Sequence, residues 1–347
     1  MAAYLLLVGT CVGALTAQVQ TELFEGRTGT DLQEALDDAY SPTRALDYGV
    51  ARDTLFAVVF RRNAKLACQY TGFEVDLPDG VDPSTFAFDQ GINTEHLYPR
   101  SKGAGTGNAL ADMHHLYPTR EGVNADRASL PFAEIDDARA QRWYYLDQQR
   151  SSPPAVSVRD AWSEQTGQAF EPRESVKGDV ARAVFYFYTM YRGNAVAADP
   201  DFFGEQVATL CDWHAADPVD ADEYARTLAI ERSQGNANPF VLDCTLPDRT
   251  GYCPQRSSAC QAVDVRTPAA ERAMRVFPNP TRGTAVVTGL RGGDVLALVD
   301  VTGRVRHTTE APGGTLTLEL PADLPAGLYT LVELRSGSTR RLILERL

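Results

Sequence analysis

Residues 93–127, NTEHLYPRSKGAGTGNALADMHHLYPTREGVNADR, decide the fold of the first part of the chain. The pieces NTEHLYP and DMHHLYP have the length of strands, and each ends at a proline. Between them, SKGAGTGNA carries three glycines and is typical of a loop. The following TREGVNADRA suits the start of a helix. The order strand, loop, strand, helix predicts a ββα unit.

The same stretch concentrates residues suited to hydrolysis, including three of the five histidines of the chain. A neutral imidazole can take a proton from water near neutral pH, which makes His96 a candidate base. Carboxylate and amide oxygens are the ligands that Mg²⁺ prefers, and Glu95 and Asn124 offer them. Neighbouring residues on a regular strand point to opposite faces. We therefore expect the strand to end or bulge at Glu95 and His96, and Pro99 favours an ending.

Most of the chain before residue 260 reads as helical. Asp31 is a candidate N-cap for DLQEALDDAY, and DTLFAVVFRR is either a helix or a buried strand. Within the loop-like 71–92, STFAFDQ predicts a short strand. The clearest helix lies in 173–191, where apolar residues at helical spacing predict a core-facing stripe. Two more helices are expected in 202–240, separated by Pro218.

Composition and the N-terminus set limits on the class of protein. The chain has 347 residues, 44% of them hydrophobic and 23% charged, which is typical of a globular protein. Its net charge of −13 argues against a protein that coats polyanions with its whole surface. The apolar run in MAAYLLLVGTCVGALTAQVQ is too short to span a bilayer and predicts a signal peptide over 1–17. The alternative is a buried first strand.

Removal of that signal would leave five cysteines, enough for two disulfides and one free thiol. The cluster CTLPDRTGYCPQRSSAC predicts a local bridge, either Cys244–Cys253 or Cys253–Cys260. Spacing alone does not fix the pairing.

From residue 275 the pattern changes to short β-rich runs, among them TAVVTGL, DVLALVDV and GLYTLVEL, with turn residues between them. This pattern is typical of a small β-sandwich. The predicted fold class is therefore α+β: a mainly helical domain around the ββα unit, followed by a small all-β, Ig-like sandwich.

Several separated motifs resemble one family. INTEHLYPRS, ADMHHLYPTREGVNADR, VKGDVARAVFYFYTMY, LCDWHAADPVDADEYAR and SQGNANPF are similar, in order and approximate spacing, to the secreted endonuclease I family of ββα-metal nucleases. The resemblance covers roughly residues 30–242. It implies a metal-dependent, largely sequence-nonspecific endonuclease that acts on DNA, and often RNA, and leaves 5′-phosphate ends. It maps a general base onto His96 and the metal ligands onto Glu95 and Asn124, with Mg²⁺, or Ca²⁺ or Mn²⁺, as the cofactor.

The family's phosphate-binding arginine has no unambiguous counterpart, because the loop between the strands is short. Arg100, Arg120 and Arg127 are the candidates, and we favour Arg127 as the catalytic arginine. Asp112 is expected to orient a ring nitrogen or to cap a turn, and His115 to support the unit structurally. In residues 91–127 four basic and four acidic side chains balance, so a bound cation would make the site positive.

The C-terminal stretches VFPNPTRG, LVDVTGRV and LPAGLYTLVELRSGSTRRLILERL resemble a type IX secretion sorting domain. The predicted organisation is a signal peptide at 1–17, a nuclease domain at 18–265, a linker at 266–274 and a sorting domain at 275–347. We expect an extracellular or cell-surface monomer without a transmembrane segment in the mature chain. Its expected partners are DNA and RNA as substrates and the type IX secretion machinery.

Two other functions remain open at this stage. The first is a zinc hydrolase with His96, His114 and His115 as ligands, although His114 and His115 would point apart on a strand. The second is a non-catalytic surface adhesin in which the nuclease-like fold is a relic. For the C-terminal tail alone, the alternative is a β-module that binds carbohydrate or protein. The intact set of Glu95, His96 and Asn124 argues against the adhesin.

Overall fold

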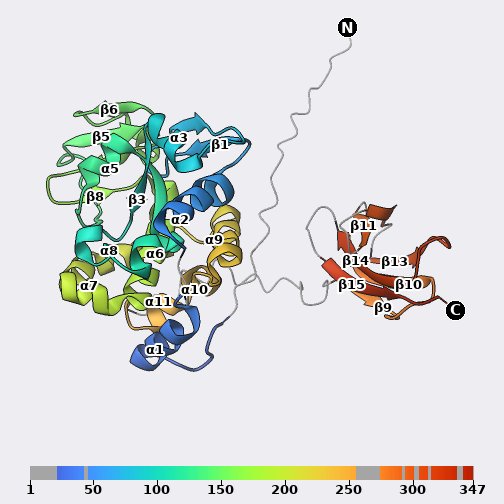
Figure 1. Cartoon of the computed structure of the whole chain (residues 1–347). Helices are drawn as coiled ribbons and strands as arrows, with labels where there is room; N and C mark the ends of the chain where they lie inside the picture. Colours follow the sequence, from blue (N-terminus) through green and yellow to red (C-terminus); the bar gives the residue numbers. More distant parts are fainter. Residues whose placement is uncertain are drawn as a thin grey trace, which may run out of the picture. The chain divides into compact units, whose positions relative to one another are not determined.

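The structure is a computed structural model, and it describes residues 22–42, 46–254, 274–290, 294–300, 305–311, 314–333 and 339–346. The chain separates into two compact units, Met1–Val263 and Asp264–Leu347. Both units contain strands, and the described helices lie in the first (Figure 1). The predicted signal peptide, residues 1–17, and the predicted linker, 266–274, lie outside the described residues except for Met274.

The described helices of the first unit include long α-helices and several short turns. Their bounds are α1 (Gly29–Tyr40), α2 (Tyr48–Thr54), the π-helix η1 (Leu55–Phe60), α3 (Pro83–Asp89), η2 (Arg100–Lys102), α4 (Asn108–Ala111), η3 (Met113–His115), α5 (Glu121–Arg127), η4 (Val156–Ala161), η5 (Glu174–Val176), α6 (Lys177–Met190), α7 (Arg192–Ala198), α8 (Phe202–Ala216), α9 (Ala221–Gln234), α10 (Pro239–Leu242) and α11 (Leu246–Arg249).

Its strands form three small antiparallel sheets. Two are pairs, β1 (Lys65–Ala67) with β2 (Glu74–Asp76) and β3 (Ile92–His96) with β4 (Leu116–Arg120). The third has the order β6-β5-β7-β8, with β5 (Arg142–Tyr145), β6 (Gln148–Arg150), β7 (Ser163–Gln165) and β8 (Phe170–Glu171). Helix α5 follows β4 directly and contacts both strands of the β3–β4 pair.

Helix α6 forms the centre of this unit. Thirteen of its fourteen residues are buried, and it packs against α1, α8 and α10. The apolar stripe predicted in 173–191 is confirmed as core, because Val180, Val184 and Phe187 are fully buried. Arg182, also fully buried, pairs with Glu223 of α9 at 2.7 Å. The helix is therefore held by both apolar packing and a buried ion pair.

Three local predictions were wrong. STFAFDQ contains helix α3 rather than a strand, because the Asp82 carboxylate accepts a hydrogen bond from the Thr85 amide and Pro83 occupies the first turn. The N-cap of α1 is Thr28, and Asp31 lies in the first turn. In DMHHLYP the histidines form the 3₁₀ turn η3, and the strand begins only at Leu116.

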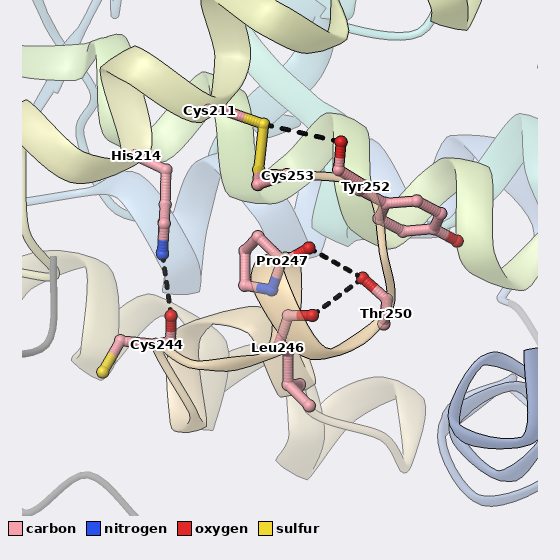
Figure 2. Close-up of a disulfide and its surroundings, with 8 residues drawn as sticks. All are labelled: Cys211, His214, Cys244, Leu246, Pro247, Thr250, Tyr252 and Cys253. Carbon is pink, nitrogen blue, oxygen red and sulfur yellow. Dashed lines mark hydrogen bonds between the residues drawn. A yellow bond between two sulfur atoms is a disulfide. The ribbon is translucent and has the colours of Figure 1, made fainter. Parts of the chain in front are cut away.

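The described disulfide differs from both predicted pairings. Cys211 of α8 bonds to Cys253, with 5.6 Å between their Cα atoms (Figure 2). Cys244 is also disulfide-bonded. Tertiary folding brings α8 next to the segment after α11. Two cysteines that are 42 positions apart in the sequence therefore lie close enough to bond. Beside this bridge, the ring of His214 donates from Nε2 to the Cys244 carbonyl at 3.0 Å. Cys68 is a buried free thiol.

The second unit is all-β in its described parts. One antiparallel sheet has the order β13-β10-β9 and the other β12-β11-β14-β15. Their bounds are β9 (Arg275–Phe277), β10 (Thr284–Leu290), β11 (Val295–Asp300), β12 (Val305–Glu310), β13 (Gly314–Glu319), β14 (Gly327–Glu333) and β15 (Thr339–Leu344). Buried side chains from both sheets, such as Val287, Leu298 and Leu331, form one core cluster. Mixed helix and strand followed by an all-β region is confirmed; the Ig-like sandwich and the sorting role stay predictions.

Candidate active site at the end of β3

Strand β3 ends at His96, so the predicted ending at the Glu95–His96 pair is present. In the antiparallel register Glu95 lies opposite Tyr117 and His96 opposite Leu116. One further backbone bond joins the Leu97 amide to the His115 carbonyl at 3.0 Å, and η2 begins after Pro99. Glu95 and His96 therefore occupy the last two regular pairs of the β3–β4 ribbon, the antiparallel pair of strands.

Glu95 is 2% exposed and has a defined set of neighbours. Its Oε1 accepts a hydrogen bond from the Tyr70 hydroxyl at 3.1 Å and lies 3.1 Å from Nη1 of Arg127. Burial raises the pKa of this carboxyl to about 7, although the Arg127 charge and the Tyr70 hydroxyl act in the opposite direction. Neither of these two neighbours engages Oε2, so Oε2 is the carboxylate oxygen that could hold a cation.

His96 is 6% exposed and neutral at physiological pH. Its Nε2 lies 3.0 Å from the Leu110 carbonyl, and because a carbonyl can only accept, Nε2 carries the proton. Burial lowers the pKa of His96 to about 3, and the nearby His115 and Arg100 contribute in the same direction. The ring therefore presents an unprotonated Nδ1, the form required of a base.

Asn124 lies on α5 and is half-buried. Its Nδ2 donates to the Thr94 carbonyl at 3.0 Å, one residue before Glu95. This bond fixes which end of the amide is the oxygen and leaves Oδ1 for a ligand. A carboxylate oxygen and an amide oxygen, both positioned by the end of β3, form a hard donor set that fits a divalent cation such as Mg²⁺.

Arg127 has a different environment from the one we predicted. It is fully buried, and it donates from Nη1 to the His96 carbonyl at 3.0 Å and from Nη2 to the Leu97 carbonyl at 2.7 Å, besides its ion pair with Glu95. A guanidinium enclosed in this way has no path to a phosphate in solvent. Its contacts instead hold the Glu95 carboxylate and the end of β3 in place.

The two other candidate arginines lie at opposite ends of the ribbon. Arg120 pairs in register with Ile92 and donates to the Leu146 carbonyl at 3.1 Å, away from His96. Arg100 is exposed on η2, and its charge contributes to lowering the pKa of His96. It also lines an open cavity of about 480 Å³ between η2 and α7, together with Gly103, Gly105, Thr106, Gly193, Asn194, Ala197 and Ala198. Arg100 is the predicted arginine that solvent can reach near the base.

Asp112 and the other histidines support the unit from inside. The Asp112 carboxylate accepts from the His114 amide at 3.0 Å and from the Tyr186 and Tyr191 hydroxyls at 2.7 Å, so it caps η3 and ties it to α6. His114 is buried and its Nε2 contacts the Asn236 carbonyl. His115 is buried, with Nε2 on the Ala109 carbonyl and its ring 5.4 Å from that of His96. Each of these two rings is thus held by a separate backbone carbonyl.

Within the described ranges, the one three-residue group of acids, cysteines or histidines close enough to share a metal is Glu134, Glu171 and Glu174. Lys177 Nζ lies among them, 3.0, 2.7 and 2.5 Å from their carboxylates. The ammonium group therefore occupies the position that a metal ion would take among these three carboxylates. The predicted three-histidine zinc site is not among these groups.

Sequence reasoning missed three residues at this site. Tyr70 holds Glu95, the Tyr48 ring lies 5.6 Å from the His96 ring, and Arg52 donates from Nε to the Thr94 hydroxyl at 3.1 Å. All three lie more than twenty positions before the motif, and no local pattern links them to it. The signal that could have identified them is tertiary contact with β3.

The chain is similar to a family of known proteins. The Endonuclease I profile matches residues 49–244. The extracellular ribonuclease of Bacillus subtilis (strain 168) is 32% identical over 170 residues, covering 43% of this chain and 50% of that protein. The periplasmic deoxyribonuclease of Aeromonas hydrophila is 28% identical over 145 residues, covering 40% and 51%. The chain spans about half the length of the curated relatives it matches.

A solved structure described as PorZ, a surface component of the type-IX secretion system of Porphyromonas gingivalis, is 22% identical over 24% of this chain and 13% of its own, with a TM-score of 0.20. This likeness is too weak to show a common fold. The profile match, by contrast, covers more than half of the chain and includes the whole β3–β4–α5 segment. The chain belongs to the Endonuclease I family.

Proposed function

We propose that this protein is a secreted, metal-dependent endonuclease that hydrolyses the phosphodiester bonds of DNA and RNA without sequence specificity. The observation that carries the proposal is the state of His96. Its Nε2 is committed to the Leu110 carbonyl, so the neutral ring keeps an unprotonated Nδ1. At the same end of β3, Glu95 and Asn124 offer oxygens to a cation. β3, β4 and α5 are the proposed ββα-metal motif.

His96 acts as the general base. Its Nδ1 takes a proton from a water molecule whose oxygen attacks phosphorus, and the bond between phosphorus and the 3′ oxygen breaks. The 3′ oxygen leaves as a hydroxyl after taking a proton from solvent, the phosphate stays on the 5′ side, and the imidazolium returns its proton to solvent. The hydrogen bond from Nε2 to Leu110 keeps the ring in one orientation during this transfer and stabilises the imidazolium that forms.

Glu95 and Asn124 are the proposed protein ligands of a Mg²⁺ ion, which Ca²⁺ or Mn²⁺ could replace. When bound, the cation supplies positive charge to the scissile phosphate and to the leaving oxygen. Tyr70 and Arg127 hold the Oε1 side of the Glu95 carboxylate, so that Oε2 keeps one direction. Arg100, exposed beside His96 and next to the cavity at α7, is the proposed phosphate-binding arginine.

Several features support the substrate class and location. The matching relatives are described as ribonucleases and deoxyribonucleases, extracellular or periplasmic. A buried disulfide is expected in an oxidising compartment. No helix of the described residues is both long and apolar enough to cross a bilayer. We propose export through a signal peptide, with the C-terminal β unit as the type IX sorting domain of a monomeric enzyme.

The test is digestion of supercoiled plasmid DNA and of a folded RNA by the purified chain, with Mg²⁺ and with excess EDTA. We expect cleavage of both substrates with Mg²⁺, none with EDTA, and a loss of at least about 100-fold in His96→Ala. His114→Ala, a buried ring held by Asn236, is the matched control for removal of an imidazole. Equal digestion by wild type and His96→Ala would end the proposal, and one tightly held zinc by metal analysis would favour the zinc hydrolase.

A further inference from the structure

Helix α2 covers the His96 side of the ribbon with two residues that are one helical turn apart. The Tyr48 ring packs 5.6 Å from the His96 ring, measured between centroids. Arg52 donates from Nε to the Thr94 hydroxyl at 3.1 Å. Thr94 and His96 are two positions apart on β3 and therefore share a face. Tyr48 and Arg52 thus contact the face that carries the proposed base.

Within the described ranges, the guanidinium of Arg52 is held in place by a hydrogen bond through Nε alone, and its terminal nitrogens are unbonded. Its Nε is fixed by Thr94, and its carbon lies 5.6 Å from the centre of the Tyr48 ring. Among the residues the structure describes, neither terminal nitrogen of Arg52 makes a hydrogen bond or an ion pair. The nearby Asp82 carboxylate is engaged in capping α3 through the Thr85 amide. The four N–H groups on the two terminal nitrogens of this planar, half-buried cation therefore remain for an anionic ligand.

Arg61 is an arginine with a terminal nitrogen that is already paired with a carboxylate. It too is anchored through Nε, to the Leu77 carbonyl at 2.9 Å, but its Nη2 lies 2.9 Å from Asp79. Arg52 differs by lacking such a carboxylate partner. The charges of both Arg52 and Arg100 act on the Tyr48 hydroxyl, which places two cations from different elements around the Tyr48–His96 pair.

We propose that Arg52 is a second phosphate-binding residue, which holds the nucleic-acid backbone at the phosphate next to the one cleaved at His96. The proposal rests on the proposed nuclease function. The Tyr48 ring lies between Arg52 and His96 in the chain of contacts, 5.6 Å from the guanidinium carbon and 5.6 Å from the centre of the His96 ring. The Tyr48 ring therefore separates Arg52 from the phosphate that reacts at His96. A contact of this kind raises affinity for any sequence and carries no base preference.

The experiment compares Arg52→Gln with Arg61→Gln as the matched control. Binding of a fluorescein-labelled 20-nucleotide DNA is measured by anisotropy in the His96→Ala background, so that no cleavage occurs, over a range of salt concentrations. We expect Arg52→Gln to weaken binding about tenfold and to reduce the slope of log affinity against log salt by about 0.7, the value for one phosphate contact on a single strand. Arg61→Gln should leave both unchanged, and Arg52→Lys should recover most of the slope.

Cleavage kinetics with His96 intact provide the second measurement. We expect Arg52→Gln to raise KM about tenfold and to change kcat less than twofold, because the contact lies outside the reacting phosphate. A fall in kcat with unchanged KM and salt slope would overturn the proposal, since it would mean that Arg52 only holds β3 through Thr94. Wild-type kinetics in Arg52→Gln would overturn it as well. If wild type itself neither binds nor cuts nucleic acid, the proposed function fails instead.

Discussion

The buried carboxyl of Glu95 makes a quantitative prediction about stability in the absence of metal. Its pKa is about 7 in the folded protein, against 4.5 for a glutamate side chain in water. Between these values the folded state binds more protons than the unfolded state, so the contribution of Glu95 to stability falls as pH rises. Each pH unit between the two pKa values is worth about 1.4 kcal/mol, so the full effect at pH 7 and above is roughly 3 kcal/mol.

Glu95→Gln replaces the carboxyl by a neutral group of the same shape. We expect wild type and Glu95→Gln to unfold at similar urea concentrations near pH 4.5, and the variant to be more stable by roughly 3 kcal/mol near pH 7.5. For a unit of this size that corresponds to roughly 6–12 °C in Tm. Glu121→Gln, which removes an exposed glutamate from α5, controls for the loss of one negative charge.

The assay is urea unfolding followed by tryptophan fluorescence, in EDTA, at half-unit steps from pH 4.5 to 8. Only the difference between each variant and wild type is used, because buried histidines such as His96 and His115 titrate in the opposite sense. A difference between wild type and Glu95→Gln that stays constant across this range would refute the reasoning. So would a variant that is less stable than wild type at every pH.

Three further predictions follow from the same contacts. Arg127→Met leaves two buried carbonyls without donors, so we expect the free energy of unfolding in urea to fall by about 3–5 kcal/mol, whereas the exposed Arg100→Met should lose little stability. The Mg²⁺ concentration for half-maximal cleavage should rise up to about tenfold per pH unit below 7, because the cation must displace the Glu95 proton; a flat profile between pH 5 and 7 would contradict this. Cys253→Ser opens a bridge across 42 positions, so we expect the free energy of unfolding to fall by about 4 kcal/mol; thermal unfolding at the wild-type Tm would contradict this.

The sequence allowed the site to be predicted where local rules decide the geometry. Pro99 and the strand-length motif placed the end of β3 at His96, and Asn124 fell on the following helix, as expected. The interior of α6 was likewise visible from its apolar spacing. These features depend on residues within a few positions of one another, where propensity and periodicity are informative.

Other features depend on contacts between distant segments. Arg127 was favoured over Arg100 and Arg120 as the phosphate-binding arginine, but the chain buries it against β3. Cys211 pairs with Cys253 because α8 folds back, which cysteine spacing does not report. η3 replaces the first half of the predicted second strand because one side chain, Asp112, captures the His114 amide. No pattern within a single window contains these partners.

Lys177 has a consequence for the medium in which the protein folds. Its ammonium group joins Glu134 before β5, Glu171 of β8 and Glu174 of η5, segments that lie up to 43 positions apart in the chain. Many proteins join such acidic side chains with a calcium ion, and their cohesion then varies with the dissolved calcium. Here the joining charge is covalently part of the chain and cannot be diluted or chelated away. Removal of free divalent ions should therefore stop catalysis while leaving this junction intact.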